Sequence, residues 1–119
     1  MADAERLICA ASELQEGGTG KRFQVALQGR LRNAFAIRWH GQVYAYVNEC
    51  QHVPIELDWN EGQFFDLSGS YLVCATHGAY YAPDSGYCLG GPCKGRVLQK
   101  LSVIERDEQI FWIDETTYG

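Results

Sequence analysis

Cys50-Gln51-His52 and Cys74-Ala75-Thr76-His77 are the two stretches that decide how this chain folds, because each places a thiol close to an imidazole. Residues 53–73 separate them. Zinc fingers of the Cys2His2 type put both cysteines in one half of the site and both histidines in the other half. Here each half supplies one cysteine and one histidine. The spacing therefore favours a four-ligand metal centre other than a zinc finger, in loops that a rigid scaffold must hold together.

The pattern C-x-H followed by C-x-x-H resembles the Rieske [2Fe-2S] ferredoxin family. In that centre two thiolates bind one iron and two imidazoles bind the other. The resemblance implies one [2Fe-2S] cluster per chain, with Cys50, His52, Cys74 and His77 as its metal ligands. The alternative, ordinary core thiols and surface imidazoles, does not explain two complete half-motifs in the expected order.

Charge explains why the two histidines matter. Two ferric ions, two sulfides and two thiolates sum to zero when the imidazoles are neutral, whereas an all-cysteine centre starts two charges lower. Adding an electron to the neutral centre costs less Coulomb work. Histidine ligation accordingly moves the reduction potential from about −400 mV to roughly −150 to +300 mV.

The composition is that of a small acidic domain. The chain has 119 residues, which suits one domain over 1–119, and 15 acidic against 10 basic residues give a formal charge of −5. This charge disfavours nucleic-acid and anionic-membrane partners and fits docking onto basic surfaces. No apolar run reaches 18 residues, and the start lacks a basic signal region. We therefore expect a cytoplasmic protein that is a monomer or a weak oligomer.

The rest of the chain reads as strands and turns. Arg6–Ala10 and Phe23–Leu27 are short β-type runs, and Ala34–Val47 is a hairpin that turns at His40-Gly41. A second hairpin is predicted from Val97–Glu105 and Gln109–Ile113. The fold class is therefore all-β, an antiparallel β-sandwich, and the resemblance implies a Rieske-like sandwich with a cluster-binding loop subdomain at about 48–93. The segment from Pro54 to Ser70 is expected to be irregular.

The resemblance also assigns residues around the cluster. Pro92, after Gly90-Gly91, matches a third loop that covers the cluster in relatives, although it could be a simple turn residue. Tyr81, four residues past His77, matches a tyrosine whose hydroxyl bonds a cysteine sulfur, or it is a half-buried strand aromatic. Ala79 stands where high-potential relatives have a serine that donates to a bridging sulfide.

Other positions depart from the family pattern. Ile55 and Thr76 occupy the places of the two loop cysteines that form a disulfide in high-potential relatives, and Pro54 replaces a common glycine. Cys9 is expected to be a small buried residue. Cys88 and Cys93 are expected to be free packed thiols, with a disulfide or a second metal half-site as alternatives. His40 is expected to be a solvated turn residue.

Four protein ligands leave neither iron an open position for substrate, and the sequence contains no Ser-His-Asp arrangement, no phosphate-binding loop and no second iron site. We therefore expect a one-electron carrier rather than an enzyme. By resemblance it would pass electrons from a flavin-dependent reductase to a terminal oxygenase or another terminal reductase. The alternatives are the small Rieske subunit of an oxidoreductase of the nitrite-reductase type and a structural or regulatory metal domain.

Overall fold

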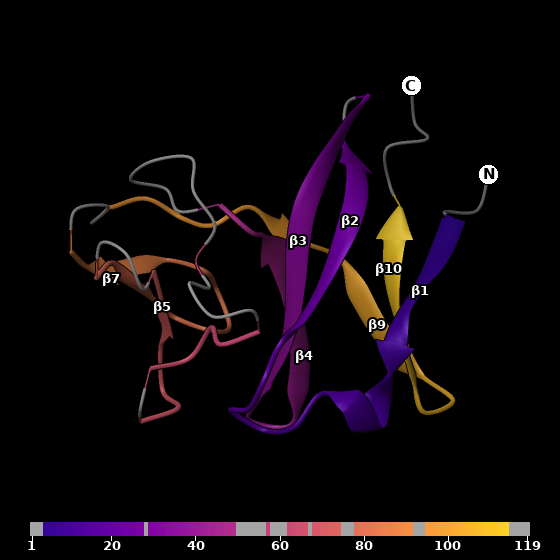
Figure 1. Cartoon of the computed structure of the whole chain (residues 1–119), viewed down its shortest axis with the longest axis horizontal. Helices are drawn as coiled ribbons and strands as arrows, with labels where there is room; N and C mark the ends of the chain where they lie inside the picture. Colours follow the sequence, from indigo (N-terminus) through magenta and orange to yellow (C-terminus); the bar gives the residue numbers. More distant parts are fainter. Residues whose placement is uncertain are drawn as a thin grey trace.

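The structure is a computed structural model that describes residues 4–27, 29–49, 57, 62–66, 68–74, 78–91 and 95–114. These residues form three antiparallel β-sheets and one 3-10 turn (Figure 1). The predicted all-β class with antiparallel strands is confirmed. In chain order the elements are β1 (Ala4–Ala10), η1 (Ala11–Glu13), β2 (Lys21–Leu27), β3 (Arg30–Trp39), β4 (Gln42–Val47), β5 (Leu72–Val73), β6 (Tyr80–Tyr81), β7 (Cys88–Gly90), β8 (Lys100–Leu101), β9 (Val103–Arg106) and β10 (Gln109–Asp114).

Two of the sheets pack face to face. One has the strand order β1-β10-β9 and the other has the order β2-β3-β4-β8. Their facing side chains form one hydrophobic cluster, because small residues of β3 and β4 let the larger side chains of the opposite sheet approach. The buried members are Cys9, Leu14, Val25, Ala34, Ala36, Ala45, Val47, Leu101, Ile110 and Trp112. The predicted burial of Cys9 is confirmed.

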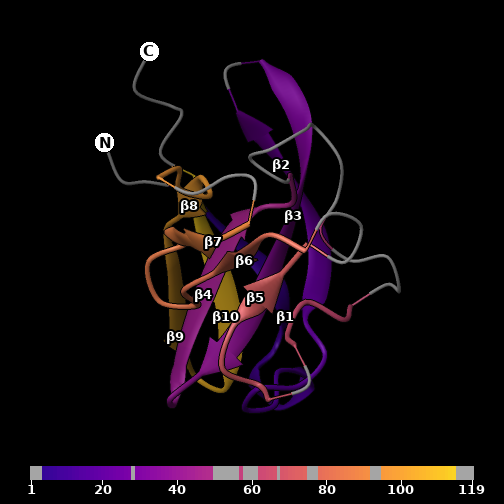
Figure 2. The same ribbon diagram turned by 90° about the vertical axis from the view of Figure 1, so that its left-hand side faces the viewer.

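The third sheet, with order β5-β6-β7, covers the opposite face of β3 and β4 (Figure 2). We call it the cluster sheet. Strand β3 is therefore buried on both faces from Ala34 to Ile37, and its odd-numbered residues point to the cluster sheet. The rings of Phe35 and Phe64 stack there at 4.0 Å. Tyr46 is buried beside them and donates a hydrogen bond to Pro83 O at 2.7 Å, and burial raises the pKa of its hydroxyl.

The hairpins agree with the sequence in part. Strands β3 and β4 turn at His40-Gly41 as predicted, and His40 is exposed at φ +50° with its ring stacked on Trp39. The prediction of one strand over Val97–Glu105 is wrong. That segment divides at Ser102, because β8 pairs with β4 whereas β9 pairs with β10. The described part of Pro54–Ser70 is irregular, as expected.

None of the helical segments among the described residues is long and apolar enough to cross a membrane.

Arg38 joins the two sandwich sheets. Its guanidinium donates to both carboxylate oxygens of Glu105 in β9, at 3.0 and 2.9 Å, and to Leu14 O at 2.8 Å. The hydrogen bonds from Arg38 lower the pKa of Glu105, although partial burial opposes the shift. The bidentate geometry and the limited exposure of Arg38 distinguish this pair from an ordinary surface ion pair.

We predict that Arg38→Ala lowers the free energy of unfolding by about 2 kcal/mol, because carbonyls and a carboxylate lose a charged donor. Glu105→Gln should cost less, about 0.5 to 1 kcal/mol, since Glu105 is partly exposed. The pKa of Glu105 is lower in the folded protein than in the unfolded chain. The ionised carboxylate therefore stabilises the folded protein at any pH above the unfolded pKa, and this stabilisation is lost as the pH falls through the folded pKa. Urea titrations of wild type and Glu105→Gln should therefore differ by a constant amount from pH 7 to about pH 5 and converge only below about pH 4, because an unfolded glutamate has a pKa of about 4.3 and the folded pKa of Glu105 is lower. Arg106→Ala, which removes an exposed pair with Glu5, serves as the control and should cost little.

Candidate metal centre

Both predicted ligand loops begin where strands of the fold end. The first loop follows β4, and the second lies between β5 and β6. Loops held by sheet strands can fix side chains at constant separation while their backbone stays near solvent. The described residues on either side of each loop show how the loop is closed.

Asn48 closes the first loop. This residue follows β4 and is only 4% exposed. Its backbone N–H donates to Asn33 O at 2.8 Å, and its side-chain Oδ1 accepts from the backbone N–H of Leu57 at 2.9 Å. Leu57 is fully buried in the cluster of residues beneath the cluster sheet. A single buried amide therefore ties the beginning of the loop that carries Cys50 and His52 to a buried residue beyond it.

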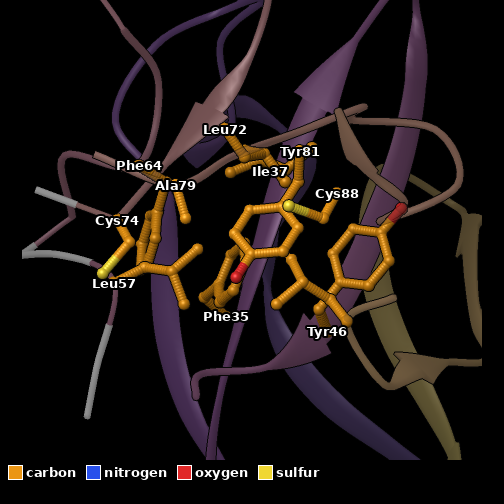
Figure 3. Packing of buried hydrophobic residues seen from close by; sticks show 11 residues of the cluster. Phe35, Ile37, Tyr46, Leu57, Phe64, Leu72, Cys74, Ala79, Tyr81 and Cys88 are labelled. Carbon is orange, nitrogen blue, oxygen red and sulfur yellow. The ribbon is translucent and has the colours of Figure 1, made fainter. Parts of the chain in front are cut away.

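The backbone closes the second loop. Cys74 N donates to Ala79 O at 2.7 Å, and Gly78 N donates to Cys74 O at 2.8 Å. The Cys74 side chain is fully buried and forms no disulfide. In Figure 3 Cys74 lies at the edge of the hydrophobic cluster, with its sulfur on the outer side next to Leu57. A buried cysteine outside any disulfide, in a loop of fixed shape, suits a thiolate ligand.

The turn that leads to β5 is held by Asp66. Its carboxylate accepts hydrogen bonds from the Ser68 hydroxyl at 2.8 Å and from the backbone N–H of Ser70 at 3.3 Å. Burial opposes ionisation, but the hydrogen bonds from Ser68 and the following backbone lower the pKa of Asp66. The carboxylate therefore stays charged near neutral pH and fixes the approach to Cys74.

The third segment packs against the second loop at two glycines. Gly91 adopts φ +87°, and a Cβ there would lie 2.8 Å from Cα of Ala79. A Cβ on Gly90 would lie 2.5 Å from the Tyr80 hydroxyl. A side chain at position 91 would meet backbone at a positive φ, so glycine is required there. One at position 90 would meet only the end of the partly exposed Tyr80 side chain. These glycines place the chain before Pro92 close to Ala79 and Tyr80. Pro92 itself lies outside the described residues, so its place over the cluster stays a prediction.

Tyr81 and Ala79 are both fully buried in the cluster beneath the cluster sheet. Figure 3 shows the Tyr81 ring beside Cys88 and Ile37. Burial agrees with Tyr81 as a core aromatic. It also suits the other interpretation, in which the Tyr81 hydroxyl bonds a cysteine sulfur, since a buried hydroxyl needs a hydrogen-bond partner.

The remaining predicted ligands lie outside the described residues. They are Cys50, His52 and His77, and with Pro92 and Cys93 their placement stays a prediction. Within the described part of the chain no three His, Cys, Asp or Glu side chains gather to hold a metal ion. Cys74 is thus the one predicted ligand whose surroundings can be judged, and they fit the assignment.

Cys88 corrects the prediction of a free thiol, because it is disulfide-bonded. Its side chain is buried on the inner face of the cluster sheet. A free thiol and a half-cystine are similarly small and apolar, so the burial expected from the sequence could not distinguish them. The expectation that a cytoplasmic protein keeps its cysteines reduced is also wrong for Cys88. That expectation concerns the redox state of the compartment and says nothing about whether two sulfurs lie close enough to bond.

Sequence reasoning missed two residues that hold the first loop. Asn48 is one, and its only sequence signal is an amide directly after an apolar strand. Arg32 is the other, and its Nη2 lies 3.2 Å from Oε2 of Glu49, the residue before Cys50. No sequence pattern gives this contact, because it depends on the register between β2, β3 and β4.

The close approach of Gly91 to Ala79 generates a test with a matched control. Gly91→Ala should cost about 2 kcal/mol or more, because the new Cβ meets backbone and φ is positive. Gly95→Ala has the same backbone problem at φ +93° but nothing within 4 Å of its Cβ, so about 1 kcal/mol is expected. Thermal denaturation and iron content of both variants measure the difference. Equal losses would show that the contact between the loops contributes nothing.

Comparison with known proteins places the chain in a family. The model of the Rieske [2Fe-2S] domain matches residues 5–105. A comparison with curated protein sequences found no match.

Solved structures share the fold. The ferredoxin of carbazole 1,9a-dioxygenase from Nocardioides aromaticivorans IC177 has a TM-score of 0.71 at 17% identity, covering 94% of this chain and 99% of its own. A complex of reduced oxygenase and oxidized ferredoxin in carbazole 1,9a-dioxygenase gives 0.72 at 23% identity, covering 94% of both chains. The terminal oxygenase from Novosphingobium sp. KA1 gives 0.69 at 20% identity, covering 96% of this chain and 31% of its own. With the family model spanning most of the sequence and the same fold in these structures, the chain belongs to the Rieske [2Fe-2S] domain family, whose domain binds a [2Fe-2S] cluster.

Proposed function

We propose that this chain is a one-electron carrier in which Cys50 and Cys74 bind one iron of a [2Fe-2S] cluster and His52 and His77 bind the other. The observation that carries the proposal is the buried Cys74 side chain, which forms no disulfide, in a loop closed by two backbone hydrogen bonds. When bound, the cluster supplies a site that accepts and releases one electron. The protein contributes the closed loops, through Asn48 and the Cys74–Ala79 contact, and the apolar packing beneath them.

Four protein ligands would fill the coordination of both irons and leave no position for a substrate. We therefore infer a component that passes electrons rather than an enzyme. The ferredoxin of carbazole 1,9a-dioxygenase, which the chain matches over 99% of that protein, supports this role, as does the oxygenase and ferredoxin complex. We propose a terminal oxygenase as the acceptor and a flavin-dependent reductase as the donor. A flavin fits because it can release one electron at a time.

A second candidate, the small Rieske subunit of an oxidoreductase, is favoured by one observation. Exposed large apolar residues gather on the cluster sheet and beside it. They are Tyr71, Tyr80, Tyr87, Leu89 and Val97. The rings of Tyr71 and Tyr80 meet edge to face at 5.6 Å. A permanent subunit would cover such a patch, so co-purification of a stoichiometric large subunit would favour this candidate over a monomeric or weakly oligomeric carrier.

We propose a cytoplasmic location, and the disulfide at Cys88 is the observation that opposes it. Structural disulfides persist mainly in oxidising compartments. Mass spectrometry of protein alkylated in an anaerobic extract tests the proposal. A reduced Cys88 in that extract supports the cytoplasm, and a fully oxidised Cys88 contradicts it.

The ligand assignment predicts the effect of removing either histidine. His52→Ala or His77→Ala should abolish the native cluster, because an iron loses a ligand and the loops lose their cross-link. The sandwich should remain folded by circular dichroism. His40→Ala is the matched control, since this exposed histidine lies at the turn between β3 and β4, and it should retain the cluster. Iron and sulfide content equal to wild type in either loop variant would contradict the assignment.

The residues beside the second loop predict the reduction potential. We expect about −150 to +100 mV, within the range for histidine-ligated centres. Ala79 offers no hydroxyl, and Tyr81 offers one. Ala79→Ser should raise the potential by some tens of millivolts and Tyr81→Phe should lower it, because a donated hydrogen bond stabilises the reduced state and about 59 mV corresponds to 1.4 kcal/mol. Protein-film voltammetry measures both. An unchanged potential in Tyr81→Phe would leave Tyr81 as a core aromatic.

The carrier role is tested by electron transfer from the dithionite-reduced protein, freed of reductant. The acceptor is the terminal oxygenase fraction of the cell that makes this chain, with stopped-flow absorbance following reoxidation. We expect one electron per chain to reach the oxygenase. A visible spectrum typical of an iron-sulfur centre with no transfer to any oxygenase would reject the proposed partner, and a colourless zinc-loaded protein would favour the structural or regulatory alternative.

A further inference from the structure

The charge of this chain is distributed unevenly along the sequence. Residues 17–48 contain five basic residues and no acidic residue, whereas the other parts of the chain contain all 15 acidic residues and the other five basic ones. The basic residues of the segment are Lys21, Arg22, Arg30, Arg32 and Arg38. The net charge of −5 therefore hides a basic region of the sequence that lies on β2 and β3, although Lys21, Arg32 and Arg38 pair with Glu13, Glu49 and Glu105.

The outer end of this basic region projects from the molecule. Pairing between β2 and β3 continues to Leu27 and Arg30, but pairing between β3 and β4 ends at Ala34 and Val47. Residues 24–27 and 30–33 therefore form a two-stranded extension, which we call the hairpin arm. Figures 1 and 2 show it rising beyond the end of β4 and above the cluster sheet. The side chains of Gln24 and Asn33 join its strands by a hydrogen bond of 3.3 Å.

The hairpin arm is fixed to the start of the first ligand loop. Asn33 O accepts the hydrogen bond from Asn48 N at 2.8 Å, and Arg32 Nη2 lies 3.2 Å from Oε2 of Glu49. Glu49 offsets part of the charge of Arg32. Arg30 is exposed and forms no ion pair with any residue that the structure describes, so its charge is available to a partner. The hairpin arm therefore lies beside Asn48 and Glu49, the residues at the start of this loop.

The hairpin arm also carries the most exposed large apolar side chain of the described residues, Leu31, at 72%. Leu31 lies on the face of β3 that carries Phe35 and Ile37, the face that the cluster sheet covers lower down. The face of the hairpin arm that carries Leu31 is therefore continuous with the face of β3 that the cluster sheet covers. Arg30 and Arg32 alternate with Leu31 along β3 and lie on the opposite face of the extension. A partner that covers this two-stranded extension would therefore contact an apolar anchor on one face and charged side chains on the other.

We propose that the hairpin arm is a docking element that receives an acidic area of the terminal oxygenase, with Arg30 as its charged contact and Leu31 as its apolar anchor. The proposal rests on the proposed function for the identity of the partner. Acidic groups elsewhere on this chain would meet basic groups of the oxygenase, and the hairpin arm would meet acidic ones. Such opposite contacts fix the orientation of an encounter more strongly than a single charged face does.

The local field is tested with two small oxidants of opposite charge. Reduced protein is mixed with ferricyanide, an anion, or with tris-phenanthroline cobalt(III), a cation. At low salt Arg30→Glu should slow the first reaction by about three- to tenfold and speed the second by a similar factor. Both effects should vanish on the order of 1 M salt, where the Debye length is about 3 Å. Arg106→Glu, at the turn after β9, makes the same change in net charge elsewhere and should have a smaller effect.

The contact itself is tested with the terminal oxygenase that the wild-type protein reduces. Arg30→Glu and Leu31→Ser should each lower the second-order rate of transfer by about threefold or more, while the cluster content and potential stay unchanged. Leu7→Ser is the matched control for Leu31, because Leu7 is 58% exposed on β1. Rates for both arm variants equal to those of Arg106→Glu and Leu7→Ser would overturn the docking proposal, as would equal effects of Arg30→Glu and Arg106→Glu on the two oxidants. Failure of wild type to reduce any oxygenase would instead reject the proposed function.

Discussion

Strand β3 is buried on both faces from Ala34 to Ile37, and the packing of the whole domain depends on this constraint. Its even-numbered residues contact the sheet of β1, β9 and β10, and its odd-numbered residues contact the layer below the cluster sheet. Two hydrophobic clusters therefore share one strand. A loss of register in β3 would exchange the two faces and disturb both clusters at once. The positions of the described loop ends depend on this strand and its neighbour β4, because Asn48 bonds to Asn33 and Cys74 packs in the cluster with Phe35 and Ile37.

Buried polar contacts, rather than apolar area, give the loops their shape. Asn48 satisfies the backbone N–H of Leu57, and Cys74 and Ala79 satisfy each other through the backbone. Loss of either contact would leave a buried polar group without a partner, which costs about 1 to 3 kcal/mol. This cost exceeds what an exposed loop contact provides. These contacts therefore fix the described ends of the two loops.

The sequence allowed the all-β class, most strands and the ligand motif to be predicted, because period-two alternation and ligand spacing are local signals. It could not predict the division of Val97–Glu105 at Ser102, since both halves look equally strand-like and only the partner strands differ. It could not predict the contacts of Asn48 or of Arg32, which depend on register. The prediction of a free thiol at Cys88 is wrong for another reason. Burial favours a small apolar side chain but does not indicate whether its sulfur is in a disulfide.

Net charge illustrates the limit of composition as an argument about partners. A net charge of −5 predicts docking onto basic surfaces of a partner only if the charges of the chain are mixed evenly. Here the segment 17–48, which contains no acidic residue, includes the hairpin of β2 and β3. Because the Debye length is about 8 Å in physiological salt, an approaching protein interacts mainly with the charges nearest to it rather than with the net charge of the chain. The hairpin arm lies beside the start of the first ligand loop, through Arg32 and Glu49. Under the docking proposal, Arg30 would present a positive charge to a partner at this edge of the molecule, whatever the total charge of the chain.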